Sequence, residues 1–274
     1  CLRQGLPQSG VTFTRGDGIG LITKPGLPIA VGEPAINPVP RQMMAEAIEQ
    51  LAAALDGPRD IVIEISVPDG AKIALKTWNP RLGIEGGLSI LGTTGVVRPF
   101  SCSAWIASIH RGIDVARANG LGHVSGSTGS TSEKAVITRY DLPEIALMDM
   151  GDFVGGMLKY MRRNPVANLT IAGGFAKMAK LGQGAIDLHS ARSQVDFTAL
   201  ADLATACGYD HDMVANANSV LDVVQKGTPK MRVKLANAIA AAAQKTALGV
   251  VASAAVNIEI LVVARDGQIN GTAG

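Results

Sequence analysis

The sequence has few aromatic residues and almost no net charge. Phe, Trp and Tyr together make up 4% of the 274 residues, so the core must be built from Ala, Val, Ile, Leu and Met. Acidic and basic residues are mixed along the chain and leave a net charge of only +2. A dedicated nucleic-acid-binding protein would carry a basic stripe, so we expect no nucleic-acid partner.

Cysteine is also scarce, with Cys1, Cys102 and Cys207 far apart in the chain. This pattern fits neither a disulfide framework nor a zinc site, so we expect a reducing, cytoplasmic environment and no metal ligands. No segment reaches the uninterrupted apolar length of a membrane span, so we expect no membrane partner. The chain begins without a methionine or a signal-peptide pattern, so we allow for a fragment whose missing N-terminus holds part of the site. The oligomeric state stays open, and a homo-oligomer is compatible with the sequence.

Hydrophobic residues make up 47% and charged residues 18%, which is typical of a well-buried α/β protein. One stretch stands apart from this composition, "TFTRGDGIGLITKPGLPIAVGEPAINPVPR", residues 12–41, which is rich in glycine and proline. These two residue types exclude a long helix. An irregular stretch of such length is uncommon inside a compact domain, and where it occurs it is usually functional or disordered.

Periodic patterns divide the chain near residue 100. Before it, the apolar spacing predicts a helix that has Pro40 in its first turn and ends at Gly57-Pro58, and "DIVIEIS" alternates as a half-buried strand does. After it come three units of strand, glycine turn and helix: "LGHVSGSTGSTSEKAV", "IALMDMGDFVGGMLKYM" and "LTIAGGFAKMAKLG". Such units build a parallel sheet with helices on its faces. We therefore predict an α/β protein with two domains, an irregular α+β lobe over residues 1–99 and a Rossmann-like lobe over residues 100–274.

The glycine turns predict where a ligand binds, because ligands of open parallel sheets lie beyond the carboxyl ends of the strands. The residues expected to let the backbone approach a ligand are Gly126, Gly129, Gly173 and Gly174. The spacing G-x-G-x-x-G of dinucleotide-binding turns is missing, which disfavours a ligand with a pyrophosphate.

Acidic residues lie at the end of the second predicted strand, the one in "IALMDMGDFVGGMLKYM". Asp149 or Asp152 can accept hydrogen bonds from ribose hydroxyls. Asp152 has an alternative role as the cap of a helix that begins at Phe153, and the two roles can coexist. The residues alone thus favour an adenosine-type ligand.

Three motifs make the chain resemble the CbiD family, the cobalt-precorrin-5B C1-methyltransferases of anaerobic cobalamin biosynthesis. They are "TFTRGDGIGLITKPGLPIAVGEPAINPVPR", "NPRLGIEGGLSILGTTGVVRP" and "LGQGAIDLHSARS", and the resemblance runs from Val11 to Ile269. It implies methyl transfer from S-adenosylmethionine to C-1 of cobalt-precorrin-5B, giving cobalt-precorrin-6A, with cobalt present only as part of the substrate. The turn "GGFAKMAKLG" departs from the glycine-glycine-lysine-leucine style of the family, and the threonine- and alanine-rich opening of the family is absent.

The resemblance also implies a large, flat substrate fringed with carboxylates, which arginine side chains can bind bidentately. Cationic side chains lie in or beside the two irregular stretches: Arg15, Lys24, Arg41, Arg81 and Arg98. We expect the set to bind the corrinoid, although any one of them alone fits an ordinary surface charge. Thr93 and Thr94 are further candidate donors, with a simple turn as their alternative.

His189 is the candidate catalytic residue because it follows the third glycine turn, at the expected ligand edge. It could accept or relay a proton, hydrogen-bond the substrate or cap a helix. His211, in "YDHD", fits a solvated turn better than a metal site. Two other classes of function stay open: a nicotinamide-dependent oxidoreductase, which should show the missing glycine fingerprint, and a non-catalytic corrinoid-binding protein.

Overall fold

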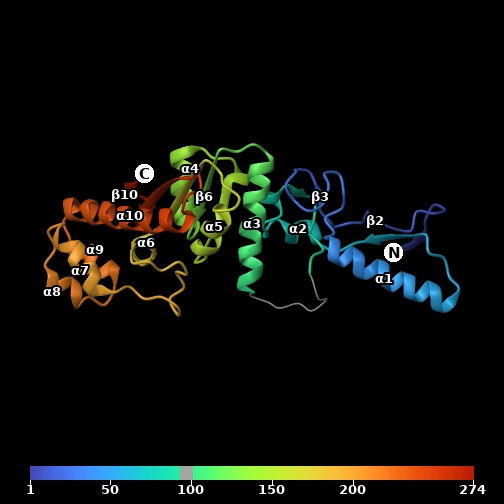
Figure 1. Cartoon of the computed structure of the whole chain (residues 1–274), viewed down its shortest axis with the longest axis horizontal. Coiled ribbons are helices and arrows are strands. Elements are labelled where there is room, and N and C mark those ends of the chain that lie inside the picture. The colour runs from blue at the N-terminus through green and yellow to red at the C-terminus, as the bar shows by residue number, and fades with distance from the viewer. Residues whose placement is uncertain (93–100) are drawn as a thin grey trace. The chain divides into compact units, whose positions relative to one another are not determined.

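The computed structural model describes residues 1–92 and 101–274. Its chain forms two compact units, Cys1–Ala104 and Trp105–Gly274, and each is described by itself. Helices and sheets that include parallel strands are present, so the α/β class expected from the sequence is confirmed (Figure 1).

The first unit holds these elements, in chain order: β1 (Leu2–Gln4), β2 (Val11–Arg15), β3 (Leu21–Ile22), α1 (Pro38–Leu55), β4 (Ile61–Ile65), α2 (Gly70–Ala74), the 3-10 helix η1 (Pro80–Leu82) and β5 (Ile84–Glu85). Strands β1, β4 and β2 form one sheet in that order, with β1 antiparallel and β2 parallel to β4. Strands β3 and β5 form a second, antiparallel pair.

The glycine- and proline-rich stretch builds a small core of its own. Its fully buried side chains are Ile19, Ile22, Ala35 and Ile36. Gly18 lets two backbone segments touch, because a Cβ atom there would lie 2.1 Å from the carbonyl oxygen of Val67. The stretch is therefore ordered by close backbone packing, which only residues without a side chain allow.

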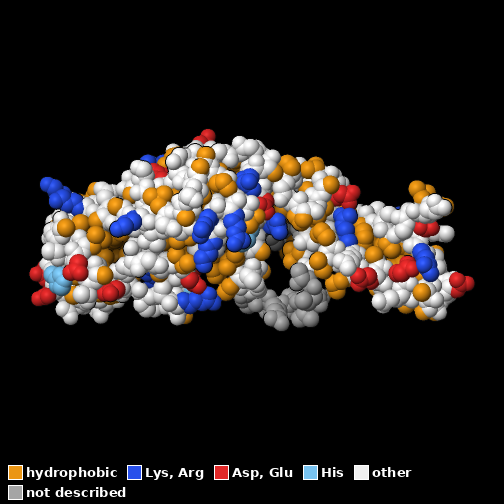
Figure 2. Space-filling model, in the orientation of Figure 1, with side chains coloured by type: hydrophobic (Ala, Val, Ile, Leu, Met, Phe, Trp, Pro, Cys, Tyr) orange, Lys and Arg blue, Asp and Glu red, His pale blue; other side chains and the backbone are white. Residues whose placement is uncertain are grey.

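Helix α1 begins at Pro38, so Pro40 lies in the first turn, as predicted. Proline is tolerated there because the first turn of a helix has no internal acceptor for its missing N–H. The apolar spacing predicted the helix but not its surroundings, since Leu51 and Leu55 are 57% and 76% exposed. Figure 2 shows hydrophobic and charged side chains side by side over α1.

The second unit holds these elements: α3 (Cys102–Ala118), β6 (His123–Ser127), α4 (Ser130–Tyr140), η2 (Glu144–Ala146), β7 (Leu147–Asp149), α5 (Val154–Met161), β8 (Asn168–Gly174), α6 (Phe175–Gly182), α7 (Phe197–Thr205), α8 (His211–Ala215), α9 (Val220–Lys226), α10 (Pro229–Val251), β9 (Asn257–Val263) and β10 (Ile269–Ala273). They include the three predicted units of strand, turn and helix.

The five strands of this unit form one sheet in the order β10-β9-β8-β6-β7. The pairs β9–β8, β8–β6 and β6–β7 are parallel, and only the edge strand β10 is antiparallel to its neighbour. Helix α4 covers one face, where Val136 packs in a cluster with Ala172 and Leu261. On the other face, Gly126 of β6 lies against Met157 of α5, and α10 packs on α5, α6, β9 and β10 (Figure 1).

Replacing two glycines of the second unit by alanine should change stability in opposite directions. A Cβ atom at Gly271 in β10 would lie 2.3 Å from the backbone carbon of Ala236 in α10, whereas one at Gly249 in α10 would meet nothing within 4 Å. We expect Gly271→Ala to lower the free energy of unfolding by about 1–3 kcal/mol through overpacking. The control Gly249→Ala should raise it by about 0.5 kcal/mol, since alanine costs less chain entropy in a helix. Urea titration of both variants measures this, and equal stabilities would contradict the packing of β10 on α10.

Candidate functional site

The carboxyl ends of β6, β8 and β9 border a pocket of about 330 Å³. Its lining is mostly small and polar, with one cation: Thr128, Gly129, Ser130, Thr131, Ser132, Gly174, Val263, Ala264 and Arg265. Helix α4 starts at this pocket, and none of the described side chains caps its N-terminus. Free backbone N–H groups, hydroxyls and a guanidinium together favour a ligand with negatively charged or hydrogen-bond-accepting groups.

The four predicted glycines divide into two kinds. Gly129 has open space where a side chain would be, and Gly174 has only one atom, at 4.0 Å; both line the pocket. Gly126 is not in a turn but inside β6, where a Cβ atom would lie 2.5 Å from the sulfur of Met157. A Cβ atom at Gly173 would meet Thr128 and Met178 below 3 Å. Packing thus accounts for Gly126 and Gly173, and the part of the prediction that stays with the pocket is Gly129 and Gly174.

Asp152 is held by a residue that the sequence did not single out. The ammonium of Lys177, on α6, lies 3.1 Å from Asp152 Oδ1 and donates a hydrogen bond of 3.1 Å to the carbonyl of Thr128. The contact with Asp152 is an ion pair without hydrogen-bond alignment, and Oδ1 is buried with no hydrogen-bond donor in the described part of the chain. Helix α5 has Phe153 at its N-cap and no side-chain cap, so the capping role predicted for Asp152 is wrong.

Asp149 ends β7 at the same edge of the sheet. Its side chain is half-buried, and its carbonyl oxygen accepts a hydrogen bond of 2.9 Å from the indole N–H of Trp105. Asp149 and Asp152 are thus both next to the turn that follows β6, as the order of strands predicted.

The segment that carries His189 is anchored beside Asp152. The Leu188 N–H donates to the Asp152 carbonyl at 2.9 Å, and the Leu188 carbonyl accepts from Lys180 Nζ at 3.1 Å. Lys180 is only 7% exposed, so this carbonyl satisfies a charge that would be costly to bury alone. His189 therefore directly follows a residue that is hydrogen-bonded to Asp152, the candidate ribose-binding acid.

The contacts of His189 define which of its nitrogens faces outward. Its Nδ1 accepts a hydrogen bond of 3.2 Å from the Ala191 N–H, so in the neutral ring Nε2 carries the proton. The exposed nitrogen is then a donor, which favours hydrogen bonding to a substrate over accepting a proton. Burial alone would raise the pKa of Asp187 beside it, but hydrogen bonds from Arg192 and from the His189 N–H outweigh burial and lower that pKa.

Three of the cations proposed for the substrate lie along one segment of the first unit. Arg15 lies 3.6 Å from where a Cβ of Gly86 would be, and the stem of Lys24 packs against Gly83. Arg81 lies in η1, just before Gly83, with its guanidinium 6.0 Å from the centre of the Trp78 ring. Residues 80–86 thus gather Arg15, Lys24 and Arg81.

Arg41 is used by the first unit itself. Its guanidinium donates to the carbonyls of Ile36 and Pro34 at 2.8 and 3.1 Å and pairs with Glu33 at 3.0 Å. These bonds explain its position without a ligand. Thr93, Thr94 and Arg98 lie outside the described residues.

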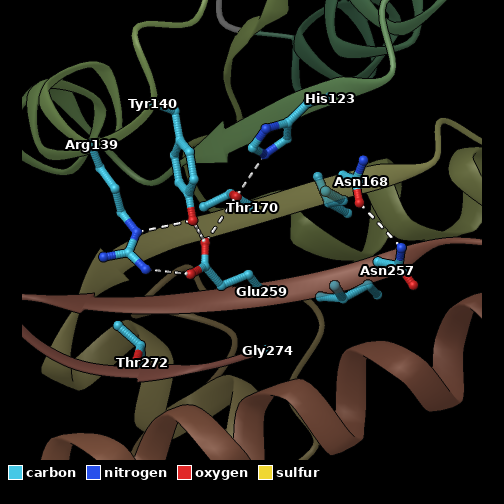
Figure 3. A pocket seen from close by; sticks show the side chains of 11 residues that line it. His123, Arg139, Tyr140, Asn168, Thr170, Asn257, Glu259, Thr272 and Gly274 are labelled. Carbon is cyan, nitrogen blue, oxygen red and sulfur yellow. Dashed lines mark hydrogen bonds and ion pairs between the residues drawn. The ribbon is translucent and has the colours of Figure 1, made fainter.

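A second pocket, of about 450 Å³, lies at the opposite, amino edge of the parallel strands (Figure 3). The carboxylate of Glu259 there accepts hydrogen bonds from Arg139, Tyr140 and Thr170, and His123 bonds Thr170 at 2.9 Å. These groups already bind one another, so the cluster joins α4 to strands β8 and β9. It lacks the unsatisfied donors of the carboxyl edge.

Over residues 1–92 and 101–274, no group of three or more His, Cys, Asp or Glu side chains could hold a metal ion. His211 is exposed and contacts Asp202 and Asp212, but it is the first residue of helix α8 and does not lie in the solvated turn that was expected. No helix in the described part of the chain is long and apolar enough to cross a membrane.

Lys177 and Lys180, like Arg265 of the pocket, are residues that sequence reasoning missed. Their signal is present in "GGFAKMAKLG", where the two lysines stand one helical turn apart directly after a strand. Only the fold shows that one reaches Asp152 and the other Leu188.

Comparison with known proteins gives the family. The family model "CbiD" matches residues 2–99, and the model "CbiD, C-terminal domain" matches residues 187–274. A protein of Brucella anthropi named "Cobalt-precorrin-5B C(1)-methyltransferase" is 58% identical over 96% of this chain and 72% of its own length. A protein of the same name from Paramagnetospirillum magneticum is 56% identical over 99% of this chain and 76% of its own length. The chain therefore belongs to the CbiD family.

Among solved structures, the crystal structure of "cobalamin biosynthesis protein (cbiD)" from Archaeoglobus fulgidus is 23% identical to this chain. The match covers 63% of this chain and 51% of that one, with a TM-score of 0.29, which is too low to inform the arrangement of either unit.

The cluster at the amino edge predicts a pH dependence of stability. Burial lowers the pKa of His123 from its ordinary value of 6.5, against the opposing charge of Glu259. The unfolded chain then takes up this proton at higher pH than the folded chain, so its contribution is complete above about pH 7 and declines as the pH falls through 6.5. We expect His123→Gln to flatten the fall in unfolding free energy between about pH 7 and pH 5. Urea titrations across this range, with the exposed His211→Gln as control, measure it; identical slopes in all three proteins would contradict the burial of His123.

Proposed function

We propose that this protein is an S-adenosylmethionine-dependent C-methyltransferase of cobalamin biosynthesis that methylates C-1 of cobalt-precorrin-5B and gives cobalt-precorrin-6A. The family membership supports the reaction, since relatives at 54–58% identity carry that name. The single observation that supports the location of the donor site is the polar pocket at the carboxyl edge of the second unit. There an open glycine turn and the uncapped N-terminus of α4 line one pocket, and Lys177 links Asp152 to Thr128 of that pocket.

The residues present at this edge fit an adenosylated amino acid. Gly129 and Gly174 would let the backbone approach it, while Asp149 and Asp152 would accept hydrogen bonds from its ribose. Arg265 and the N–H groups of α4 would bind its carboxylate. We assign the second unit, a Rossmann-like sheet in this proposal, to the methyl donor and the first unit to the corrinoid.

S-adenosylmethionine supplies a methyl group that is already activated on a sulfonium. The protein therefore needs alignment and exclusion of water more than a strong base. His189 presents its Nε2–H outward, so its proposed role is to donate a hydrogen bond that orients the substrate. Arg15, Lys24 and Arg81 would hold substrate carboxylates, and Arg98, Thr93 and Thr94 remain candidates for the same role. Arg41 is the weakest member of the set because its own loop uses its guanidinium.

The two alternative classes have less support. A nicotinamide-dependent oxidoreductase would need a pyrophosphate site, and the turn after β6 lacks the glycine spacing for it. A non-catalytic corrinoid-binding protein would leave the polar carboxyl edge of the second unit without a ligand. Three free thiols fit the proposed cytoplasmic location.

The donor site is tested by thermal shift and calorimetry with S-adenosylhomocysteine. A ligand that binds only the folded state at 100 times its Kd stabilises it by about 2.7 kcal/mol, so the melting temperature should rise, whereas NAD should leave it unchanged. Asp152→Asn keeps the shape but removes the charge and should weaken binding about tenfold. The control Asp212→Asn, at a side chain that is 93% exposed, should bind normally. A crystal structure with this ligand wholly within residues 1–99 would refute the site.

The role of His189 is tested by two replacements that differ only in hydrogen bonding. Gln places a donor nitrogen near the position of Nε2, and Phe fills a similar volume with none. We expect His189→Phe to lower kcat about tenfold, His189→Gln to retain most of it, and both to bind S-adenosylhomocysteine as the parent does. Equal kcat values in all three proteins would assign His189 a structural role only.

A further inference from the structure

Trp105 is a large apolar side chain that the fold leaves in contact with solvent. It lies one turn before Ile109 on α3, in the stripe that Ile113 continues, and those two isoleucines are fully buried. Trp105 itself is 44% exposed. In a chain with only two tryptophans, such exposure leaves a broad ring available for a partner.

The ring is fixed although it is exposed. Among the strands of the described residues, β7 pairs with β6 alone, and the carbonyl of Asp149 on its outer side accepts a hydrogen bond of 2.9 Å from the indole N–H. Gly151 supports the ring, since a Cβ atom there would lie 3.4–3.8 Å from three indole atoms. Phe153 also contacts it, with its ring centre 6.1 Å from that of Trp105 and the two ring planes at 53°. A side chain held in this way loses little freedom when a ligand packs on it.

The position of the ring follows from the strand order. The pocket of Gly129 and Gly174 lies at the ends of β9, β8 and β6, and the acids of residues 149–152 follow β7, the next strand outward. Trp105 bonds to that same segment from the side away from β6. Along the edge of the sheet, the order is therefore the pocket, then the acids, then the indole, with neighbouring strands about 4.8 Å apart.

We propose that Trp105, backed by Phe153, is the platform on which the purine ring of the methyl donor stacks. This rests on the proposed function and adds the base-binding end of its site. The purine is joined to the ribose, so once the acids hold the ribose hydroxyls, the base extends outward to the next surface. That surface is the indole. Aromatic faces bind bases through stacking and need no further polar group.

A different occupant would be the sulfonium itself, because cations also bind to indole faces. The geometry favours the base. The pocket with Arg265 and the N-terminus of α4 takes the carboxylate end of the molecule, and the sulfonium sits between that end and the ribose, on the far side of the acids from Trp105.

Fluorescence tests the proposal without any change at position 105. Trp78→Phe leaves Trp105 as the single tryptophan. We expect S-adenosylhomocysteine, and also adenosine at higher concentration, to quench its emission by stacking, whereas methionine should not. Quenching by S-adenosylmethionine but not by adenosine would overturn the assignment to the purine.

Affinity provides the second measurement. Trp105→Ala should weaken binding of S-adenosylhomocysteine about 10- to 100-fold and Trp105→Phe by less, while the matched control Trp78→Ala should bind as the parent does. If Trp105→Ala does not fold, Trp105→Phe and the fluorescence titration decide. A parent protein that binds S-adenosylhomocysteine, with an unquenched Trp105 and normal affinity in both variants, would overturn the platform and leave the proposed function standing. A folded parent that does not bind S-adenosylhomocysteine would overturn both.

Discussion

Parallel pairing of β6, β8 and β9 is the constraint on which the candidate site depends. Strand β8 bonds to β6 on one side and to β9 along seven residues on the other. Because the three strands run in one direction, their carboxyl ends meet at one edge, and Thr128, Gly174 and Arg265 line one pocket although they are distant in sequence. The pairing of these strands thus sets the distances within the candidate site, and the loops that follow them supply its side chains.

Helix α6 couples the remaining parts of the site to this edge. It begins directly after β8, and two of its lysines reach separate segments. Lys177 joins the turn after β6 to Asp152, while the buried Lys180 holds the carbonyl of Leu188. The segment before His189 is held to α6 by this bond and supplies the acceptor that the buried ammonium needs. One helix therefore orders the acid and the histidine together.

Sequence reasoning recovered the elements of this fold better than the roles of single residues. The three units of strand, turn and helix follow from periodicity, which depends on local spacing alone. Gly126 and Gly129 could not be told apart, because a glycine required for packing and one required for ligand access both simply lack a Cβ atom. Likewise, the spacing in α1 predicted a helix but not the exposure of Leu51, since a pattern does not show what covers it. Partners such as Lys177 emerge only when β6, β7 and α6 meet.

The amino and carboxyl edges of the sheet differ in how completely their polar groups are hydrogen-bonded. This difference suits a structural role for the amino edge and a binding role for the carboxyl edge. At the amino edge, Glu259 receives hydrogen bonds from two other elements, α4 and β8. At the carboxyl edge, Asp152 Oδ1 has no aligned donor in the described chain and α4 starts without a side-chain cap. Unsatisfied polar groups cost free energy in the empty protein. This difference supports the proposal that the donor site lies at the carboxyl edge, where the backbone N–H groups that begin α4 line a pocket.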